Sequence, residues 1–480
     1  MATSPPPEPS LTYLRPEVSK LKERLDEFIE NEVIPAEAEY HQHMKDRHTN
    51  GKGSNDSRWS IDAIPPCLSR LQTRARELGF WNLFLPPRLL EYPHWDPKLL
   101  GPVGPNNVLC PSVTLTYREY GILAESMGRS IELGSMVCNC SAPDTGNMEV
   151  LLEFGTPAQQ RQYLKPLLEA KIRSTFLMTE PDVASSDPTN LETVLIKHKQ
   201  KHNNNDGQEY TLRGRKWWST GAMDPRCRIG ICVAKIVDEE AEEENDNKNE
   251  NSNLHGQHTI VLVPLPNTNV RMIRSLQVFG YDDAPFGHAE IGLESVPLKQ
   301  EHLIGGLGSG FKVSQARLGP GRIHHCMRSI GLAHRCYQLM LERSTQRKTF
   351  GKFLCQHGTV QKDIADSFHD LQQARLLTLD CAHRMDTSPT GPRGARQHIS
   401  SIKVAVPALC LRIIDRALQV HGGLGVCQDT ILASAWAGMR TLRIADGPDE
   451  VHRRSVARME IKKWVMAKQE ADELQQRSRL

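Results

Sequence analysis

Hydrophobic and polar positions follow three different patterns along the chain, and the changes divide it into three regions. In the first region apolar residues recur every three or four positions, which is typical of amphipathic helices, so we expect an N-terminal helical domain over residues 1–172. Short runs of β-branched and aromatic residues then predict a central β domain over residues 173–300. Helical spacing returns in two long segments and predicts a C-terminal helical bundle over residues 301–480.

Prolines and glycines mark the expected ends of the helices. Pro35 is predicted to end the first helix, and the polar, glycine-containing stretch 41–60 is predicted to form a loop. Further helices are expected at 67–79, 115–127, 158–170, 360–382 and 399–420. Because they hold Gly or Pro, the expected breaks between the last helices are 389–394, 422–425 and 447–448.

The central region is expected to hold strands at 174–178, 209–219, 228–237, 259–265 and 287–296. Residues 238–257 interrupt this series and are dominated by Glu, Asn and Asp. They hold too few apolar side chains to bury a core, so we interpret them as a disordered acidic insertion. An acidic docking segment is the functional alternative.

Composition narrows the expected partners. The 480 residues carry 59 Lys and Arg against 57 Asp and Glu, and a net charge of +2 gives no electrostatic reason to expect nucleic acid binding. Small molecules are therefore the expected partners. No apolar stretch reaches the roughly 18 to 20 residues that span a bilayer, so no membrane span is expected.

Targeting signals are expected at one end only. Residues 1–10 carry Pro and Glu in place of the apolar core of a secretory signal or the arginine-rich pattern of a transit helix, so export and mitochondrial import are not indicated. Ser478, Arg479 and Leu480 form a conservative variant of the Ser-Lys-Leu peroxisomal address. The peroxisome is the expected location, with the mitochondrion or the cytoplasm as alternatives.

Cysteine and histidine positions do not predict a metal site. Among the twelve scattered cysteines, Cys138 and Cys140 lack the two-residue gap of common zinc and redox motifs, so we expect reduced thiols. His324, His325 and Cys326 are adjacent in sequence and would point in different directions on a helix. We therefore expect no metal.

The segment 445–452, Ala-Asp-Gly-Pro-Asp-Glu-Val-His, places a carboxylate just before a break between two helices. A helix N-terminus offers backbone N–H donors and a partial positive charge, so an oxyanion could be stabilised there while Asp446 takes a proton. Ordinary turn chemistry explains the same residues, because Asp before Gly-Pro is common in turns and Asp449 and Glu450 suit the first turn of a helix. Local sequence leaves both interpretations open.

Several familiar nucleotide-binding and catalytic loops are absent from the sequence. It contains no G-x-G-x-x-G after a strand, no G-x-x-x-x-G-K-[ST] and no G-x-S-x-G. A Rossmann dehydrogenase, a P-loop enzyme and an α/β-hydrolase are therefore not expected.

Five segments, taken in order, resemble the acyl-CoA dehydrogenase family. They are Phe-Leu-Met-Thr-Glu-Pro-Asp-Val-Ala-Ser-Ser at 176–186, Trp-Trp-Ser at 217–219, Arg-Lys-Thr-Phe-Gly-Lys at 347–352, Gln-Val-His-Gly-Gly at 419–423 and Ala-Asp-Gly-Pro-Asp-Glu at 445–450. With the block at 317–328, the chain is most similar to the branch whose larger relatives carry an N-terminal kinase-like (aminoglycoside phosphotransferase-like) domain. The resemblance covers essentially the whole chain. It implies an α+β fold with an N-terminal helical domain, a central β-barrel-like domain and a C-terminal four-helix bundle.

The resemblance also implies FAD, held between the last two domains and across a subunit interface of a homodimer or homotetramer. Taken alone, the two tryptophans could be core aromatics, the glycines a helix cap and the Arg-Lys pair a solvated surface. The positions that match cofactor-binding residues of the family are Phe176, Met178, Thr179, Ser185, Ser186, Trp217, Trp218, Ser219, Arg347, Gln419, Gly422, Gly423, Pro448 and Glu450. The positions that match the substrate site are Ser185, Arg322 and Gly447.

In the implied reaction Asp446 is the catalytic base. It falls where most family members have a Glu, and it would remove the α-proton of an acyl-CoA while the β-hydride passes to the flavin, giving a trans-2-enoyl-CoA. The Asp446 backbone N–H and a flavin ribityl hydroxyl would bind the thioester carbonyl. Burial against the thioester and the flavin is expected to raise the pKa of Asp446.

The expected function is therefore FAD-dependent dehydrogenation of a medium- to long-chain or branched acyl-CoA in fatty acid β-oxidation. Electron-transfer flavoprotein or oxygen would be the electron acceptor. The Asp at the base position leaves a nitroalkane oxidase of similar fold open, and a peroxisomal location leaves an oxygen-consuming acyl-CoA oxidase open. A scaffold that has lost its cofactor is the alternative outside enzymology.

Overall fold

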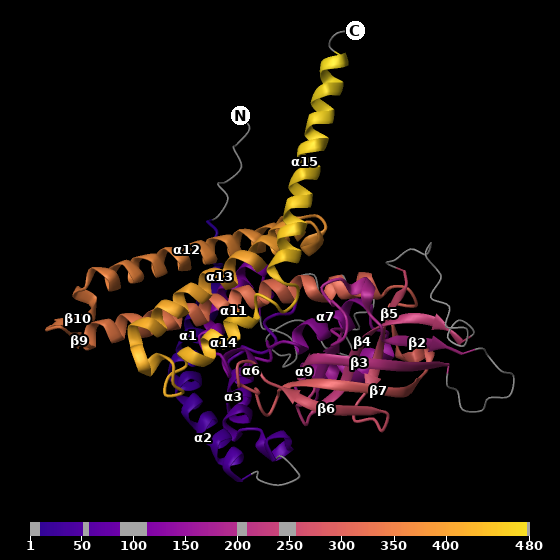
Figure 1. The fold of residues 1–480 in the computed structure, drawn as a ribbon, viewed down its shortest axis with the longest axis horizontal. Coiled ribbons are helices and arrows are strands. Elements are labelled where there is room, and N and C mark those ends of the chain that lie inside the picture. Colours follow the sequence, from indigo (N-terminus) through magenta and orange to yellow (C-terminus); the bar gives the residue numbers. More distant parts are fainter. Residues whose placement is uncertain (1–9, 51–56, 87–112, 199–208, 240–255, 478–480) are drawn as a thin grey trace. The chain divides into compact units, whose positions relative to one another are not determined.

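The computed structural model describes residues 10–50, 57–86, 113–198, 209–239 and 256–477 (Figure 1). Their contacts group the chain into two compact units, one made of residues 1–15, 117–129 and 322–480 and the other of residues 16–116 and 130–321. We call them the helical unit and the sheet unit. The three-domain division of the sequence stays a prediction. Residues 240–255 of the predicted insertion at 238–257 and the C-terminal tripeptide at 478–480 lie outside the described residues, while Asp238 is the last residue of a strand.

The sheet unit begins with helices. They are α1 (Pro16–Phe28), a π-helical turn (Ile29–Val33), α2 (Ile34–Asn50), α3 (Pro66–Glu77), α6 (Gly134–Val137), α7 (Asp144–Phe154), α8 (Pro157–Gln159), a second π-helical turn (Gln160–Leu164) and α9 (Lys165–Leu168), with short 3₁₀ turns at Ser57–Trp59 and Ile61–Ala63. Apolar residues at helical spacing in α1 are buried, as the sequence pattern predicts.

Two predictions for this region are wrong. Pro35 does not end the first helix, because the π-helical turn shifts the hydrogen-bond register and leaves Pro35 as the second residue of α2. In the first turn of a helix the missing N–H of proline costs little. The predicted loop at 41–60 is helical as far as Asn50. Residues 41–50 are polar but contain neither Gly nor Pro, so polarity alone did not stop the helix.

The strands form one mixed sheet. It contains β1 (Arg173–Leu177), β2 (Val194–Lys197), β3 (Tyr210–Thr220), β4 (Cys227–Asp238), β5 (His258–Pro264), β6 (Val270–Leu276), β7 (His288–Leu298) and β8 (Leu303–Ile304). The order is β6-β7-β3-β2-β4-β5-β8, and β1 pairs in parallel with β4. The five predicted strands are confirmed. The sequence analysis missed β2, β6 and β8, of which β8 is only two residues long and β6 is mostly exposed.

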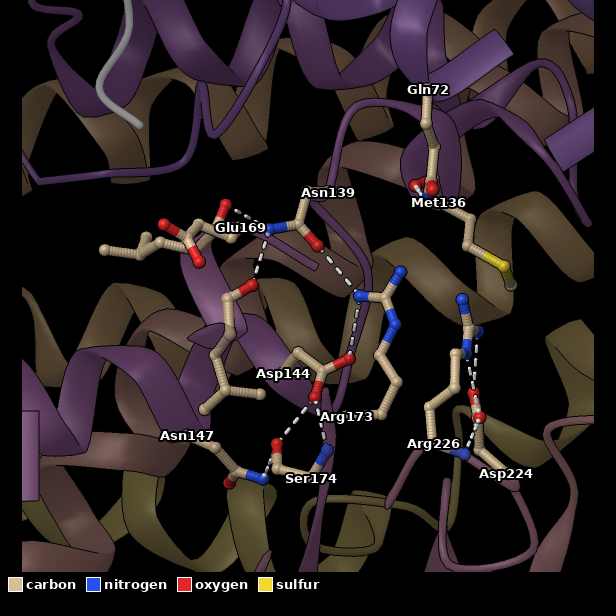
Figure 2. A network of polar contacts seen from close by, with 12 residues as sticks. Gln72, Met136, Asn139, Asp144, Asn147, Glu169, Arg173, Ser174, Asp224 and Arg226 are labelled. Atoms are coloured by element: carbon tan, nitrogen blue, oxygen red, sulfur yellow. Dashed lines mark hydrogen bonds and ion pairs between the residues drawn. The ribbon is translucent and has the colours of Figure 1, made fainter. Parts of the chain in front are cut away.

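A buried polar network ties α7 to the start of β1, as Figure 2 shows. Asp144 accepts hydrogen bonds from the backbone N–H (2.8 Å) and the hydroxyl (2.6 Å) of Ser174, and its other oxygen lies 3.2 Å from Arg173. The Arg173 guanidinium also donates to Asn139 (2.8 Å). Burial raises the pKa of Asp144, against the influence of Arg173, which remains close enough to compensate the charge. The network fixes the strand that leads into the segment 176–186.

The helical unit contains α5 (Tyr117–Gly128), most of α11 (Gly310–Gln346), α12 (Gly358–Thr387), α13 (Arg396–His421), α14 (Leu432–Thr441) and α15 (Asp449–Arg477). A hairpin of β9 (Lys348–Thr349) and β10 (Lys352–Phe353), a 3₁₀ turn (Leu354–Gln356) and two more 3₁₀ turns, at Gly391–Arg393 and Gly422–Gly425, connect them. α13 packs against α12, α14 and α15 (Figure 1). The predicted breaks at 389–394, 422–425 and 447–448 are confirmed.

A buried carboxylate joins three of these helices. Glu125 of α5 accepts a hydrogen bond from Arg375 Nε of α12 (2.9 Å), and its other oxygen lies 3.6 Å from His334 Nδ1 of α11. Burial alone would raise the pKa of Glu125, but Arg375 and His334 outweigh it and lower the pKa to about 2. The carboxylate is therefore ionised at neutral pH and fixes the helix that carries His325. No helix within the described ranges has the combination of length and apolar composition needed to cross a membrane.

Candidate active site

The two aromatic-rich motifs meet inside the sheet unit. The first, at 176–186, continues from β1, and the second, at 217–219, lies near the end of β3. The backbone N–H of Trp217 donates to the carbonyl of Thr179 (2.9 Å), so the two predicted flavin-contacting segments are held side by side. Tertiary structure thus brings together two motifs that the sequence only placed in order.

A buried ion pair supports this junction. Lys216 Nζ lies 2.7 Å from Glu180 Oε1, and it also donates to the carbonyls of Met178 (3.0 Å) and Val233 (2.8 Å). Glu180 in turn accepts the backbone N–H groups at 192–193 (2.7 and 3.0 Å). Burial acts to raise the pKa of Glu180, but Lys216 and these hydrogen bonds outweigh it and hold the pKa below its usual value. The Lys216–Glu180 pair therefore holds the backbone at Met178 and Thr179 in place.

The tryptophan motif lies on an irregular part of β3. The pairing of β3 with β7 shifts register between Lys216 and Ser219, and Trp218 has a positive φ of 50°, which is uncommon for a bulky residue. Trp218 is partly exposed and its ring lies 5.7 Å from that of His288. The buried Trp217 Nε1 and Ser219 Oγ have no hydrogen-bond partner among the described residues. A flat polar ligand would supply the missing partners.

The serines of the first motif have different surroundings. The Ser185 hydroxyl accepts the Glu180 backbone N–H (2.9 Å) and lies within hydrogen-bonding distance of the Glu180 and Val183 carbonyls, so it closes a turn. Ser186 is exposed. A small hollow of about 10 Å³ lies beside this segment, lined by Met178, Val233, His258, Phe311 and Ser314, among others. Its lining is mainly apolar.

Phe176 is covered by a cation that the sequence analysis did not identify. The Arg317 guanidinium stacks 4.3 Å from the centre of the Phe176 ring. Burial raises the pKa of Glu149 to about 8, although Arg317 opposes this rise. Near neutral pH Glu149 is therefore mostly protonated, and the cation over Phe176 is not fully neutralised by it.

In the helical unit, Asp446 lies in the connection between α14 and α15. Its φ is +55° and that of Gly447 is +102°, so the chain turns sharply through two consecutive left-handed residues. The Asp446 carbonyl accepts hydrogen bonds from Arg322 Nε (3.0 Å) and lies 3.2 Å from His452 Nε2. The predicted base and the predicted substrate residue Arg322 are thus in direct contact.

Two further side chains reach the same turn. Lys403 of α13 is fully buried and donates to the carbonyls of Leu442 and Gly447, the latter at 3.4 Å. Burial lowers its pKa, while nearby acidic groups, Asp446 among them, oppose this. The carboxylate Oδ2 of Asp446 lies 3.4 Å from Nε2 of His325 on α11, and the two side chains are 17% and 22% exposed. The carboxylate is therefore largely removed from water but flanked by polar groups.

Gly447 is required by this geometry. At φ +102° an L-residue is strained, and a Cβ would lie 2.8 Å from His452 Nε2. We expect Gly447→Ala to shift the Asp446 turn, lower the limiting rate of the proposed acyl-CoA reaction at least about tenfold and cost roughly 1–3 kcal/mol of stability. Stopped-flow flavin reduction and thermal unfolding measure the two effects. Gly358→Ala is the control, because Gly358 has no atom within 4 Å of a built Cβ and no positive φ; equal behaviour of the two variants would contradict the argument.

The remaining predicted cofactor residues of the helical unit lie at its element ends. Arg347 is exposed and directly precedes β9, and Phe350 at the hairpin tip is 99% exposed. Gln419 is exposed near the end of α13, where Gly422 at φ +63° ends the helix. A Cβ on Gly422 or Gly423 would meet nothing within 4 Å, so the backbone there is open to a ligand.

Pro448 and Glu450 are placed differently from each other. Pro448 immediately precedes α15 and its carbonyl accepts the Val451 N–H (3.0 Å), while Glu450 is exposed and 3.3 Å from Arg453. The neighbouring Asp449 is buried and paired with Arg443 (2.7 Å), so it holds the start of α15. Among the described residues, no group of His, Cys, Asp and Glu side chains could hold a metal ion.

The sequence analysis missed five residues at the motif junction in the sheet unit and at the Asp446 turn. Glu180 and His452 lie inside motifs that the sequence analysis quoted, but their contacts could not be inferred from those motifs. Lys403 lies among the apolar positions of α13, and a charge on a buried face is itself a signal. Lys216 and His325 gave no local sign of their partners.

Comparison with known proteins agrees with this arrangement. Residues 175–296 match the family model "Acyl-CoA dehydrogenase, middle domain", and residues 308–460 match "Acyl-CoA dehydrogenase, C-terminal domain". The chain is 42% identical over 438 residues to "Probable acyl-CoA dehydrogenase FadE2" of Mycobacterium tuberculosis, covering 91% of this chain and 94% of that protein. The chain belongs to the acyl-CoA dehydrogenase family. The family resemblance is confirmed.

Other relatives are consistent with the predicted branch of the acyl-CoA dehydrogenase family. The chain is 42% identical over 439 residues to "Acyl-CoA dehydrogenase family member 11" of Gallus gallus, covering 91% of this chain and 50% of that protein. The chain spans about half, or less, of the length of the first plant and animal relatives that it matches. The extra regions of those proteins have no counterpart in the matched residues.

Solved structures confirm the predicted fold class, in which helical regions precede and follow a central sheet region along the sequence. A putative acyl-CoA dehydrogenase from Mycobacterium abscessus is 39% identical with a TM-score of 0.80, covering 94% of this chain and all of that one. The FAD complex of PigA is 18% identical with a TM-score of 0.68, covering 93% of this chain and 98% of that one. At that identity the second likeness concerns the fold alone.

Proposed function

We propose that the protein is an FAD-dependent acyl-CoA dehydrogenase that converts an acyl-CoA to a trans-2-enoyl-CoA. One observation carries the proposal: in a member of this family, a carboxylate that is only 17% exposed lies on a left-handed turn beside His325, while Arg322 and His452 hold the backbone carbonyl of the same residue. A base that must attack a weakly acidic C–H bond needs such partial removal from water and a fixed position.

The chain's own residues fit FAD. Trp217 Nε1 and Ser219 Oγ are buried and have no partner within the described part of the chain, beside the strand end that Lys216 and Glu180 fix. Gly422 and Gly423 leave backbone open at the end of α13. We propose that the full set of matched residues in both units binds FAD. Bound FAD would supply the acceptor for a hydride from the β-carbon.

The remaining steps belong to this chain. Asp446 takes the α-proton of the thioester, and Arg322 and His452 fix its backbone through the Asp446 carbonyl. Lys403 keeps the turn closed from the α13 side and contributes a positive charge near a site that becomes anionic as the α-proton leaves.

The same proposal includes the type of acyl group, the metabolic role, the location, the electron acceptor and the oligomeric state. We propose a medium- to long-chain or branched acyl group, a role in fatty acid β-oxidation and a peroxisomal location. Electron-transfer flavoprotein or oxygen would reoxidise the flavin. The exposed Phe350 at the β9–β10 hairpin supports a homodimer or homotetramer, because a fully exposed aromatic at a hairpin tip favours contact with another chain.

An anaerobic flavin-bleaching screen tests the proposal. The purified protein is expected to be yellow, and acyl-CoAs of increasing length, octanoyl-CoA and palmitoyl-CoA among them, are expected to bleach its flavin band while nitroethane does not. Reoxidation by electron-transfer flavoprotein or by oxygen then identifies the acceptor. A colourless protein would favour a scaffold, and bleaching by nitroethane would favour a nitroalkane oxidase; either result would overturn the proposal.

A further inference from the structure

His325 lies against the proposed base but belongs to no motif assigned to the reaction. It is the second residue of the adjacent pair His324-His325 on α11, and its ring nitrogen Nε2 is 3.4 Å from Asp446 Oδ2. The two side chains come from elements far apart in the sequence. Their meeting is a property of the folded helical unit.

The other ring nitrogen of His325 fixes the tautomer. Its Nδ1 lies 3.4 Å from Nη2 of Arg328, one turn further along α11. A guanidinium has only donors, so Nδ1 must accept and therefore carries no proton. In the neutral ring the single proton is then on Nε2, the atom that faces Asp446.

The charged groups around His325 favour this neutral form. Burial lowers the pKa of His325, and Arg328 and Lys403 lower it further, while Asp446 acts in the opposite direction. Above this lowered pKa the ring is uncharged. The contact with Asp446 is then an N–H donor facing a carboxylate and not an ion pair between two charges.

Asp446 needs such a donor. The terminal torsion of an aspartate is broad, so covalent geometry does not fix the plane of the carboxylate. The Asp446 side chain is short and extends from a backbone position with a φ of +55°. Arg322 and His452 hold the carbonyl of Asp446. Only a partner at the carboxylate itself can set which oxygen faces the substrate.

We infer that His325 is the positioning residue of the reaction: its Nε2–H donates to Asp446 Oδ2 and fixes the plane in which the carboxylate meets the α-proton. The inference rests on the proposed function for the identity of the substrate. A donor to the ionised carboxylate also stabilises the charged form, so His325 holds down the pKa at which Asp446 becomes active.

Three variants separate the donor from the bulk of the ring. His325→Gln places an amide N–H close to the position of Nε2, His325→Asn places it nearer to that of Nδ1, and His325→Leu removes it. We expect Leu and Asn to lower the limiting rate of flavin reduction by acyl-CoA about 10- to 100-fold, and Gln to stay within about threefold of the wild type. Binding of the enoyl-CoA product should change less than about threefold in all three. His369→Gln, on the exposed face of α12, is the control.

The pH profile provides a readout that a merely structural role would not move. With the donor lost, Asp446 should protonate more easily, so the acidic limb of the reduction rate moves to higher pH by about one to two units in His325→Leu. In His325→Gln the acidic limb of the pH profile should stay at its wild-type position. Flavin content and thermal unfolding show whether each variant is folded.

A measurement without substrate tests the contact itself. In holoprotein labelled with ¹⁵N-histidine, the His325 signal, identified by its loss in His325→Gln, is expected to report a neutral Nε2–H tautomer from about pH 6 to 9 and to shift in Asp446→Asn. A ring that titrates near its ordinary pKa, carries its proton on Nδ1 or ignores Asp446→Asn would overturn the inference. So would a His325→Leu variant with wild-type rate and pH profile.

Failure of the inference and failure of the proposed function give different results. If acyl-CoA reduces the flavin of the wild type and of His325→Leu equally, only the role of His325 is wrong. If no acyl-CoA reduces the wild-type flavin, the proposed function is wrong and the catalytic part of the inference falls with it, whatever the histidine spectrum shows.

Discussion

Asp446→Asn should lower the rate of flavin reduction by acyl-CoA about 10³-fold or more. Asparagine has nearly the same size and can still accept from the His325 Nε2–H, but its amide has no useful basicity, so proton removal loses its base. The Asp446 backbone, held by Arg322 and His452, is unchanged by the substitution. The loss should therefore fall on the chemical step and not on folding or binding.

Anaerobic stopped-flow absorbance of the flavin band measures this rate, and titration with the enoyl-CoA product measures binding. Asp446→Glu is the matched variant, since it keeps the carboxylate and adds one methylene. We expect it to retain a measurable rate, because it keeps a basic carboxylate on the same turn beside His325. If Asp446→Asn reduced its flavin within tenfold of the wild type, another group would have to be the base.

Lys216→Met should be the most destabilising single change, at roughly 3–5 kcal/mol, because it leaves the Glu180 carboxylate buried without its cation. Lys216 is fully buried and Glu180 is 4% exposed. Their contacts also hold the carbonyl of Met178 beside the predicted flavin segment. A lower melting temperature and loss of FAD during purification are expected together. Lys197→Met, an exposed lysine on β2, is the control and should change stability by less than about 0.5 kcal/mol.

The deficit of Lys216→Met should depend on pH in a defined direction. The pKa of Glu180 is held below its ordinary 4.5 in the folded protein, so the pair contributes stability above pH 4.5 and loses it as the pH falls through the lowered pKa. The difference between variant and wild type should thus be greatest at neutral pH and shrink in acid. In the double variant Lys216→Met with Glu180→Gln, part of the stability should return, because no buried charge remains. A deficit that stays constant as the pH falls from 7 through the lowered pKa of Glu180 would contradict this account.

Much of the fold followed from local patterns. Helical spacing located α12 and α13, and alternation with β-branched residues located β1, β3, β4, β5 and β7, because both depend on side chains close in sequence. The errors have the same origin. Pro35 and the polar stretch 41–50 were predicted to interrupt the helix, but with a π-helical turn and packing in the sheet unit the helix continues through both. Strands as short as β8 leave no periodic signal.

By itself the sequence determined the family, the order of helical and β regions and the presence of a carboxylate at 446, since each depends on residue types at fixed spacing. Only the tertiary structure decided what surrounds that carboxylate: Arg322 of α11 reaches its backbone across 124 positions, His325 comes from the same helix, and Lys403 comes from α13. Periodicity tells which face of a helix is buried but not which side chain it will meet. The packing of the helices decides which side chains meet, and the periodicity of the sequence does not specify these individual contacts.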